Sequence, residues 1–173
     1  MLGLVLAVNA CNNSSNRQQQ SAFGDFVGQE VQFTNLIPLN VPVNLNLDSL
    51  LANTIYKVVI YVDSSNCEDC RIYQAIGIKG YELELKRKQK EVLFIYIFNT
   101  QDIFIIKERL DRYGFHQFYF VDVEGTFLAN NRIPANKRYH TFLMRKNKVQ
   151  IVGNPATSQK VRGEYNKTLK ISK

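Results

Sequence analysis

Two cysteines, Cys67 and Cys70, constrain the fold of this chain more than any other feature of its 173 residues. The run before them, residues 56–63, is rich in aromatic and β-branched side chains and predicts a buried strand. From Arg71 onward, apolar side chains recur at helical spacing (Ile72, Ala75, Ile76, with Lys79 continuing the pattern). The sequence therefore predicts a strand, a short polar turn and a helix that opens with two cysteines.

Two cysteines at the start of a helix are typical of a thiol–disulfide redox site. The unpaired N–H groups and the positive dipole end of the helix favour a thiolate, and the spacing puts both sulfurs on one face of the first turn, close enough to bridge. Half of a zinc site is the alternative. A structural zinc needs four ligands, and the chain adds only Cys11, His116 and His140.

The position of Cys11 predicts a different role from that of the other two cysteines. It ends the apolar run 1–10 and precedes a polar segment rich in Asn, Ser and Gln. This arrangement resembles the lipobox of bacterial lipoproteins, although no Lys or Arg precedes the apolar run. We expect a signal-peptide remnant over 1–10, a lipidated flexible tether over 11–24 and one domain over 25–173. A buried N-terminal strand with an incidental cysteine is the alternative.

The formal net charge of +7 is unevenly placed. The positive and negative charges of residues 51–136 cancel. The excess lies in the last 37 residues, which contain ten Lys and Arg side chains and one acidic residue, Glu164. Nucleic acid is one partner for such a tail, but we expect none for an exported lipoprotein. A solvated face near anionic head groups fits better.

Periodicity predicts an α/β protein. Strands are expected at 56–63, 92–98 and 118–122, a short strand or hairpin at 26–33, and a hairpin at 140–144 and 148–153 around Lys146-Asn147. The cysteine helix should weaken at Gly77 and Gly80. A second helix, capped by Asn99 or Thr100, should end at Gly114. A last amphipathic helix includes Val161, Tyr165 and Leu169. This order predicts a mixed central sheet with helices on both faces.

The order of these elements resembles the thioredoxin superfamily, in particular its membrane-anchored periplasmic branch of TlpA, ResA and peroxiredoxin-like proteins. More narrowly, residues 63–70, 120–122, 140–144 and 152–155 resemble thioredoxin-like lipoproteins of Bacteroidetes. The likeness covers roughly residues 50–173. It implies a three-layer α/β/α sandwich with a mixed central sheet. It also implies catalysis by Cys67 and Cys70 on protein thiols and disulfides, with no cofactor beyond the redox-active disulfide.

The departures from the thioredoxin pattern concern the predicted site. Asn66 stands in place of the usual Trp, and Glu68-Asp69 in place of Gly-Pro. Tyr61 takes the position of a buried acid, and His140 that of a cis-proline before Thr141. A cis bond before a non-proline residue costs about 2.5–4 kcal/mol, so we expect a trans bond there. His140 and Thr141 form the predicted substrate-facing loop.

Glu68 and Asp69 bear on the redox chemistry. Two carboxylates beside Cys67 disfavour its thiolate and oppose the helix dipole, which predicts a reductase-like or regulatory couple. The two acids also favour the start of the helix electrostatically, an interpretation compatible with the first.

His140 supports a rival function. Cys67, Cys70 and His140 together would suit Cu(I) or Zn(II), and Sco-type copper chaperones, which this chain resembles in part, combine a cysteine pair with a histidine. A plain loop histidine is the alternative for His140, and His116 is expected to have no role. A binding-only domain with a structural disulfide is a third possibility.

From these features we predict a membrane-anchored thiol–disulfide oxidoreductase of the bacterial cell envelope, on the periplasmic or outer-membrane face. Its expected partners are protein thiols and disulfides, an unidentified membrane electron donor, and the lipid bilayer through an acylated Cys11.

Overall fold

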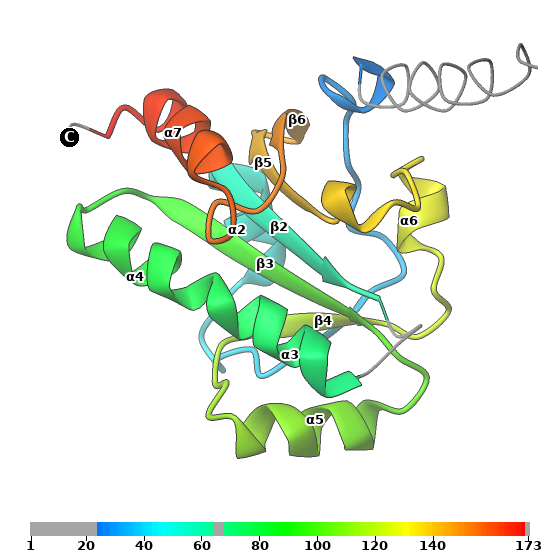
Figure 1. Ribbon diagram of the computed structural model, residues 1–173. Helices are drawn as coiled ribbons and strands as arrows, with labels where there is room; N and C mark the ends of the chain where they lie inside the picture. The colour runs from blue at the N-terminus through cyan, green and yellow to red at the C-terminus, as the bar shows by residue number, and fades with distance from the viewer. Residues whose placement is uncertain (1–23, 64–67, 172–173) are drawn as a thin grey trace, which may run out of the picture.

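A computed structural model describes residues 24–63 and 68–171. Its centre is a six-stranded sheet in the order β1-β4-β3-β2-β5-β6 (Figure 1). The strands are β1 (Ile37–Leu39), β2 (Tyr56–Val62), β3 (Val92–Asn99), β4 (Tyr119–Asp122), β5 (Thr141–Arg145) and β6 (Lys148–Val152). β2, β3 and β4 run parallel, while β1, β5 and β6 are antiparallel to their neighbours. The predicted mixed sheet is confirmed.

β2 and β3 form the middle of the sheet. They pair in parallel from Tyr56 opposite Val92 to Val62 opposite Phe98. Each strand contains five consecutive buried residues, because helices or loops cover both faces. Burial on both sides explains why these two strands are near-continuous apolar runs in the sequence rather than alternating patterns.

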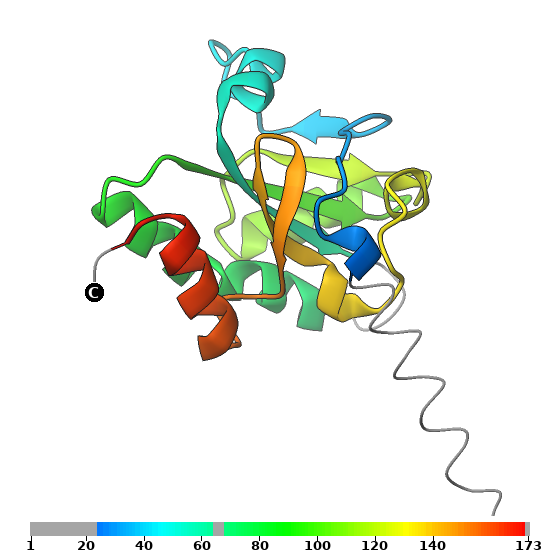
Figure 2. The same cartoon turned by 90° about the horizontal axis from the view of Figure 1, so that it is seen from above.

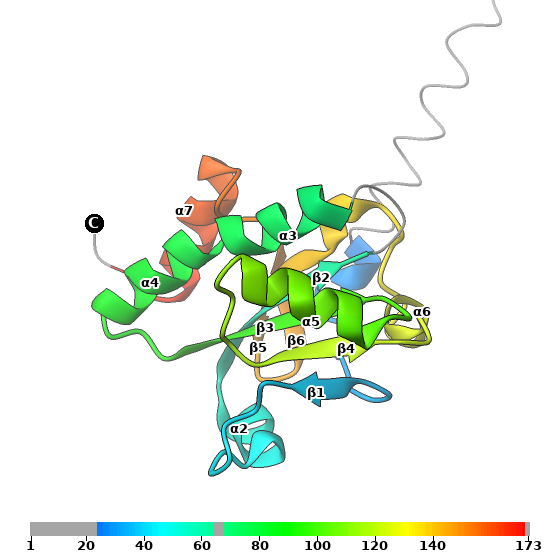
Figure 3. The ribbon, with the colours of Figure 1, turned by 90° about the horizontal axis from the view of Figure 1, so that it is seen from below.

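Four helices cover one face of the sheet (Figures 1 and 3). They are α3 (Glu68–Gly77), α4 (Lys79–Arg87), α5 (Ile103–Arg112) and α7 (Gln159–Thr168). The chain moves from β2 to β3 to β4 in one direction across the sheet, and right-handed crossovers then place α3, α4 and α5 on the same face. Ile72, Tyr81, Leu110 and Tyr165 bring these helices into one core with Val58 of β2.

The opposite face carries shorter pieces (Figure 2). They are α2 (Leu47–Asn53), α6 (Phe127–Asn130), the 3₁₀ turn η1 (Lys137–Tyr139) and the segment that precedes β1. Phe26, Leu51 and Phe127 pack there against Ile95 and Phe142 of the sheet. The three-layer α/β/α arrangement is confirmed, with the long helices on one side.

The prediction of a strand or hairpin over residues 26–33 is wrong. Gly24–Phe26 form a helical turn, and the segment makes a single antiparallel bridge, between Glu30 and Lys148. Two features explain the difference. The ring of Phe26 packs edge-on against Phe142 with the centroids 5.2 Å apart, and Gly28 has a φ of +89°, which breaks an extended run.

The start of α5 also differs from the prediction. Asn99 remains in β3, where it pairs with Asp122, and Thr100 is not the cap. Asp102 caps the helix, because its Oδ1 accepts the N–H of Ile105 at 2.9 Å. The predicted end of this helix at Gly114, with a φ of +64°, is confirmed.

The predicted weakness of the cysteine helix is confirmed as an interruption, since α3 ends at Gly77 and α4 begins at Lys79. The hairpin of β5 and β6 turns at Lys146 as predicted, with a φ of +56°. None of the described helices combines the length and the apolar character that crossing a bilayer requires.

Candidate functional site

The predicted redox site lies where β2 ends and α3 begins. Cys70 is the third residue of α3, so its backbone lies in the first turn of that helix. Cys67 and Cys11 lie outside the described residues. The predicted order of a strand followed by a helix is therefore present, and the helix begins at the C-terminal edge of the parallel strands.

His140 and Thr141 lie at the same edge, at the start of β5. Thr141 is buried and pairs with Ile60 of β2. The His140 carbonyl accepts the N–H of Tyr61 at 2.8 Å, and its ring meets the Tyr61 ring edge-on with the centroids 5.4 Å apart. His140 as a whole is only 5% exposed. This predicted loop residue is thus part of the buried wall beside the end of β2.

The peptide bond before His140 is trans, as predicted, since the described residues contain no cis peptide bond. The backbone of the segment is fixed by β-sheet pairing on both sides. Thr141 pairs with β2, and its carbonyl accepts the N–H of Gly153 at 2.7 Å.

Tyr61 and Asp122 form a buried pair that the sequence did not indicate. The Tyr61 hydroxyl, near the end of β2, donates to Oδ2 of Asp122, the last residue of β4, at 3.2 Å. Asp122 also accepts the N–H groups of Thr126 and Phe127, each at 3.0 Å. The carboxylate therefore holds the start of α6 against the sheet and links β4 to β2 across β3. An acid that ends an apolar strand just before a glycine turn is the signal that could have indicated it.

The surroundings of Tyr61 keep it neutral. Burial is the main cause that raises the pKa of Tyr61 far above its ordinary value, and the charge and hydrogen bond of Asp122 raise it further. A hydrogen bond to Asn99 acts in the opposite direction, and Asp63 adds a small increase. At the position where thioredoxins carry a buried acid, this chain thus has the neutral phenol of Tyr61. The negative charge lies instead on Asp122 of β4, which is separated from β2 by β3.

The predicted metal set combined Cys67, Cys70 and His140, of which Cys67 is outside the described residues. Among the residues whose side chains the structure describes, which do not include Cys70, no group of three or more His, Cys, Asp or Glu is arranged to hold a metal ion. His116 is exposed in the connection between α5 and β4.

Comparison with known proteins identifies the fold. No protein-family model matches the sequence, and no curated protein matches it. Among solved structures, a candidate thiol:disulfide interchange protein DsbE from Chlorobium tepidum superposes with a TM-score of 0.54 at 13% identity, over 83% of this chain and 97% of that one. A domain of a candidate thiol-disulfide isomerase from Cytophaga hutchinsonii also gives 0.54, at 16% identity, over 84% and 97% of the two chains.

A thioredoxin-like protein from Bacteroides caccae superposes over 98% of this chain with a TM-score of 0.51 at 14% identity, and this chain spans 58% of that longer one. These three likenesses agree with the sheet order and the helix placement described above. The chain has a thioredoxin-like fold, as its sequence predicted.

Proposed function

We propose that this chain is a membrane-anchored, extracytoplasmic thiol–disulfide oxidoreductase that uses Cys67 and Cys70 as a dithiol–disulfide couple. One observation carries the proposal: Cys70 lies in the first turn of the helix that follows the central strand of a thioredoxin-like sheet. A helix N-terminus stabilises a thiolate, so this is the place in the fold where thiol chemistry is favoured.

The reaction begins when the Cys67 thiolate attacks one sulfur of a partner disulfide. A mixed disulfide forms, and the other partner sulfur leaves as a thiolate that takes up a proton. The Cys70 thiolate then attacks the Cys67 sulfur and releases the second partner thiolate. The partner gains two electrons, the cysteine pair is oxidised, and a dithiol donor at the membrane reduces the pair again in the same way.

One feature favours the reducing direction. Glu68 and Asp69 between the cysteines disfavour a thiolate, and a less acidic thiol gives a less oxidising couple. We attribute the extracytoplasmic location to acylation of Cys11, which would tether the domain through the residues that follow it.

The assignment of the two cysteines has a direct test. In Cys70→Ala the mixed disulfide cannot be resolved, so we expect partner proteins to accumulate on Cys67 and to appear by mass spectrometry of non-reduced samples. The matched variant Cys67→Ala should trap far less. Trapping through Cys70 alone would reverse the proposed roles.

A redox titration separates this function from a binding-only domain with a structural disulfide. In the Cys11→Ala variant, equilibration with glutathione buffers should convert the pair between dithiol and disulfide within the glutathione range, about −180 to −320 mV. A pair that stays oxidised well below that range, in a protein with no exchange activity, would contradict the oxidoreductase.

A further inference from the structure

The end of the molecule opposite the start of α3 carries an unusual density of positive charge. We call this surface the basic end. Its cations come from three places in the sequence: the last turn of α4 and the connection to β3, the tip of the β5–β6 hairpin, and the C-terminal end of α7 (Lys86, Arg87, Lys88, Lys90, Arg145, Lys146, Lys148, Lys167 and Lys170). All are exposed except Lys90, which is half-buried.

Contacts in the fold bring these three places together. Tyr56, the first residue of β2, pairs with Val92 on one side and with Arg145 on the other, so the start of β3 and the hairpin tip lie level at one edge of the sheet. Lys90 Nζ donates to the carbonyl of Lys170 at 2.9 Å, which places the end of α7 beside the same connection. In Figure 1 the last turn of α4 and the C-terminal end of α7 lie on the opposite side of the molecule from the start of α3.

Most of this charge is not neutralised within the protein. Lys86 and Lys88 pair with Glu82 and Glu84. Six of the cations form no ion pair with any residue of 24–63 or 68–171 (Arg87, Arg145, Lys146, Lys148, Lys167 and Lys170). The exposed acids of this end are fewer, namely Glu30, Asp48 and Glu91.

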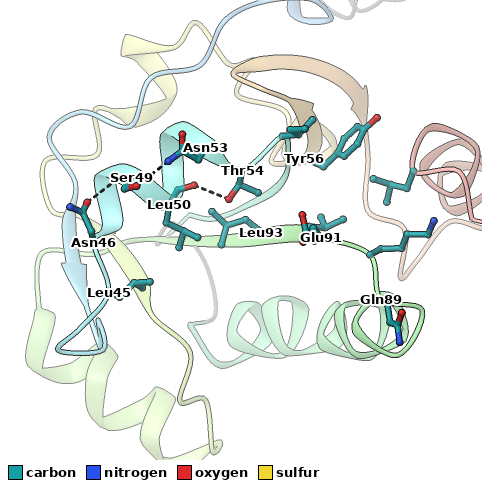
Figure 4. Close-up of a pocket in the computed structure, with 14 residues that line it drawn as sticks. Leu45, Asn46, Ser49, Leu50, Asn53, Thr54, Tyr56, Gln89, Glu91 and Leu93 are labelled. Carbon is teal, nitrogen blue, oxygen red and sulfur yellow. Dashed lines mark hydrogen bonds between the residues drawn. The ribbon is translucent and has the colours of Figure 1, made fainter.

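An open groove of about 930 Å³ borders two of the basic segments, the connection from α4 to β3 and the C-terminal end of α7 (Figure 4). It runs between α2 and the start of β2 and β3, and both Lys90 and Glu91 line it. Its apolar lining consists of aliphatic side chains (Leu45, Leu50, Ile55, Val92, Leu93 and Leu169). Ile55 at its rim is 54% exposed. The basic end thus combines exposed cations with an accessible aliphatic surface.

We propose that the basic end docks on a bilayer that contains anionic phospholipids. The cations contact the head-group phosphates, and the rim around Ile55 reaches the boundary between head groups and acyl chains. Charge complementarity favours this partner, since clustered Lys and Arg side chains are attracted to an anionic leaflet. Single-stranded nucleic acid would use exposed aromatic rings for stacking, and the exposed aromatics Tyr73 and Phe104 lie on α3 and α5 instead. Docking in this orientation points the cysteine end of the strands away from the bilayer.

Co-sedimentation with vesicles tests the proposal. The full chain carries Cys11→Ala, so that no acyl group contributes, and the vesicles are phosphatidylcholine with or without about a third phosphatidylglycerol. We expect binding to the anionic vesicles that weakens at high salt. Arg145→Gln/Lys146→Gln should lower the binding constant about 25-fold, because each cation near the surface contributes about fivefold.

A matched control lies at the other end of the same strand. Lys137→Gln/Arg138→Gln removes one Lys and one Arg before β5, near the cysteine end, and should change binding by less than about threefold. The apolar contact has its own pair of variants. Ile55→Ser should weaken binding about threefold or more, while Ile105→Ser on α5, 40% exposed, should not.

Three results would overturn the proposal. They are equal losses in the two charge variants, equally strong binding to neutral vesicles, and loss of oligonucleotide binding in Arg145→Gln/Lys146→Gln with vesicle binding unchanged. Circular dichroism of each variant establishes that the comparison is made on folded protein.

Discussion

Asp122 shows how a single buried side chain can organise the site. Its two carboxylate oxygens accept three hydrogen bonds, from the Tyr61 hydroxyl and from the N–H groups of Thr126 and Phe127. An ionised carboxylate can accept at all of these positions, because it carries no proton of its own. The negative charge is therefore a structural requirement of the edge where β4 ends.

We expect Asp122→Asn to destabilise the protein by about 1–3 kcal/mol. In either orientation of the amide, its NH₂ group would face at least one donor, so at least one of the three donors would lose its partner in a buried place. Urea denaturation measures the loss. Asp111→Asn on the exposed surface of α5 is the matched control, with an expected change within about 0.5 kcal/mol.

Equal urea midpoints for Asp122→Asn and Asp111→Asn would contradict the role assigned to the carboxylate. Tyr61→Phe gives an independent measurement if Asp122→Asn fails to fold. It removes one of the three donors and leaves the other two in place, so it should be milder than Asp122→Asn.

At the scale of elements, two glycines differ in whether their surroundings leave room for a side chain. Gly80 lies in α4, and a Cβ there would meet nothing within 4 Å. Gly153 follows β6 with a φ of +121°, and a Cβ there would lie 2.8 Å from Cγ2 of Val161. Val161 is β-branched and lies in the first turn of α7, so it has little freedom to move aside.

The two alanine substitutions should therefore shift stability in opposite directions. Gly80→Ala should stabilise the protein by about 0.5–1 kcal/mol, since alanine loses less backbone entropy in a helix. Gly153→Ala should destabilise it by about 1–3 kcal/mol, because it adds backbone strain and crowds Val161. Thermal denaturation of both variants decides the matter, and a Gly153→Ala protein as stable as the wild type would show that the β6–α7 connection can relax.

At the scale of the whole molecule, buried tyrosines predict the response to alkaline pH. Burial is the main cause that raises the pKa of five of them (Tyr61, Tyr81, Tyr96, Tyr119 and Tyr165). For Tyr81 the pKa rises to about 12, with Glu84 adding to the effect and Arg162 opposing it. In the unfolded chain these groups ionise near pH 10.

Stability should therefore be lost as the pH rises from 10 to about 12. A tyrosine whose pKa is higher in the folded than in the unfolded protein contributes its full stabilisation at pH values below the unfolded pKa. This stabilisation is lost as the pH rises from the unfolded to the folded pKa, at up to about 1.4 kcal/mol per pH unit for each group. Burial lowers the pKa of Lys57, so below about pH 10.5 this one group makes the protein more stable as the pH rises. The five tyrosines act in the opposite direction and outnumber it.

Urea denaturation at pH 9 and pH 11 measures this loss. Tyr81→Phe should lose less stability between the two pH values than the wild type, because it removes one of the groups that unfolding allows to ionise. Equal losses in both proteins would contradict the assignment to Tyr81.

Much of the fold could be predicted because its signals are local. β2 and β3 are runs of apolar residues too long and too β-branched for a surface element, and the cysteine pair marks the helix between them. Gly114 and the Lys146 turn have backbone conformations that few residues adopt, so the sequence limits where the chain can change direction. These local signals were sufficient to predict the mixed sheet and the thioredoxin-like order of its elements.

Tertiary contacts decided the rest. Residues 30–33 alternate between polar and apolar side chains as a strand does, yet the segment forms no strand, because Gly28 breaks the extended run and Phe26 packs against Phe142. Tyr61 and Asp122 are 61 residues apart, and no spacing rule joins them. The basic end likewise collects cations from three distant segments, which are brought together by the pairing of β2 with β3 and β5 and by the contact of Lys90 with Lys170. The sequence determines which side chains are available, but long-range pairing decides which of them meet, since that depends on the free energy of the whole packed core.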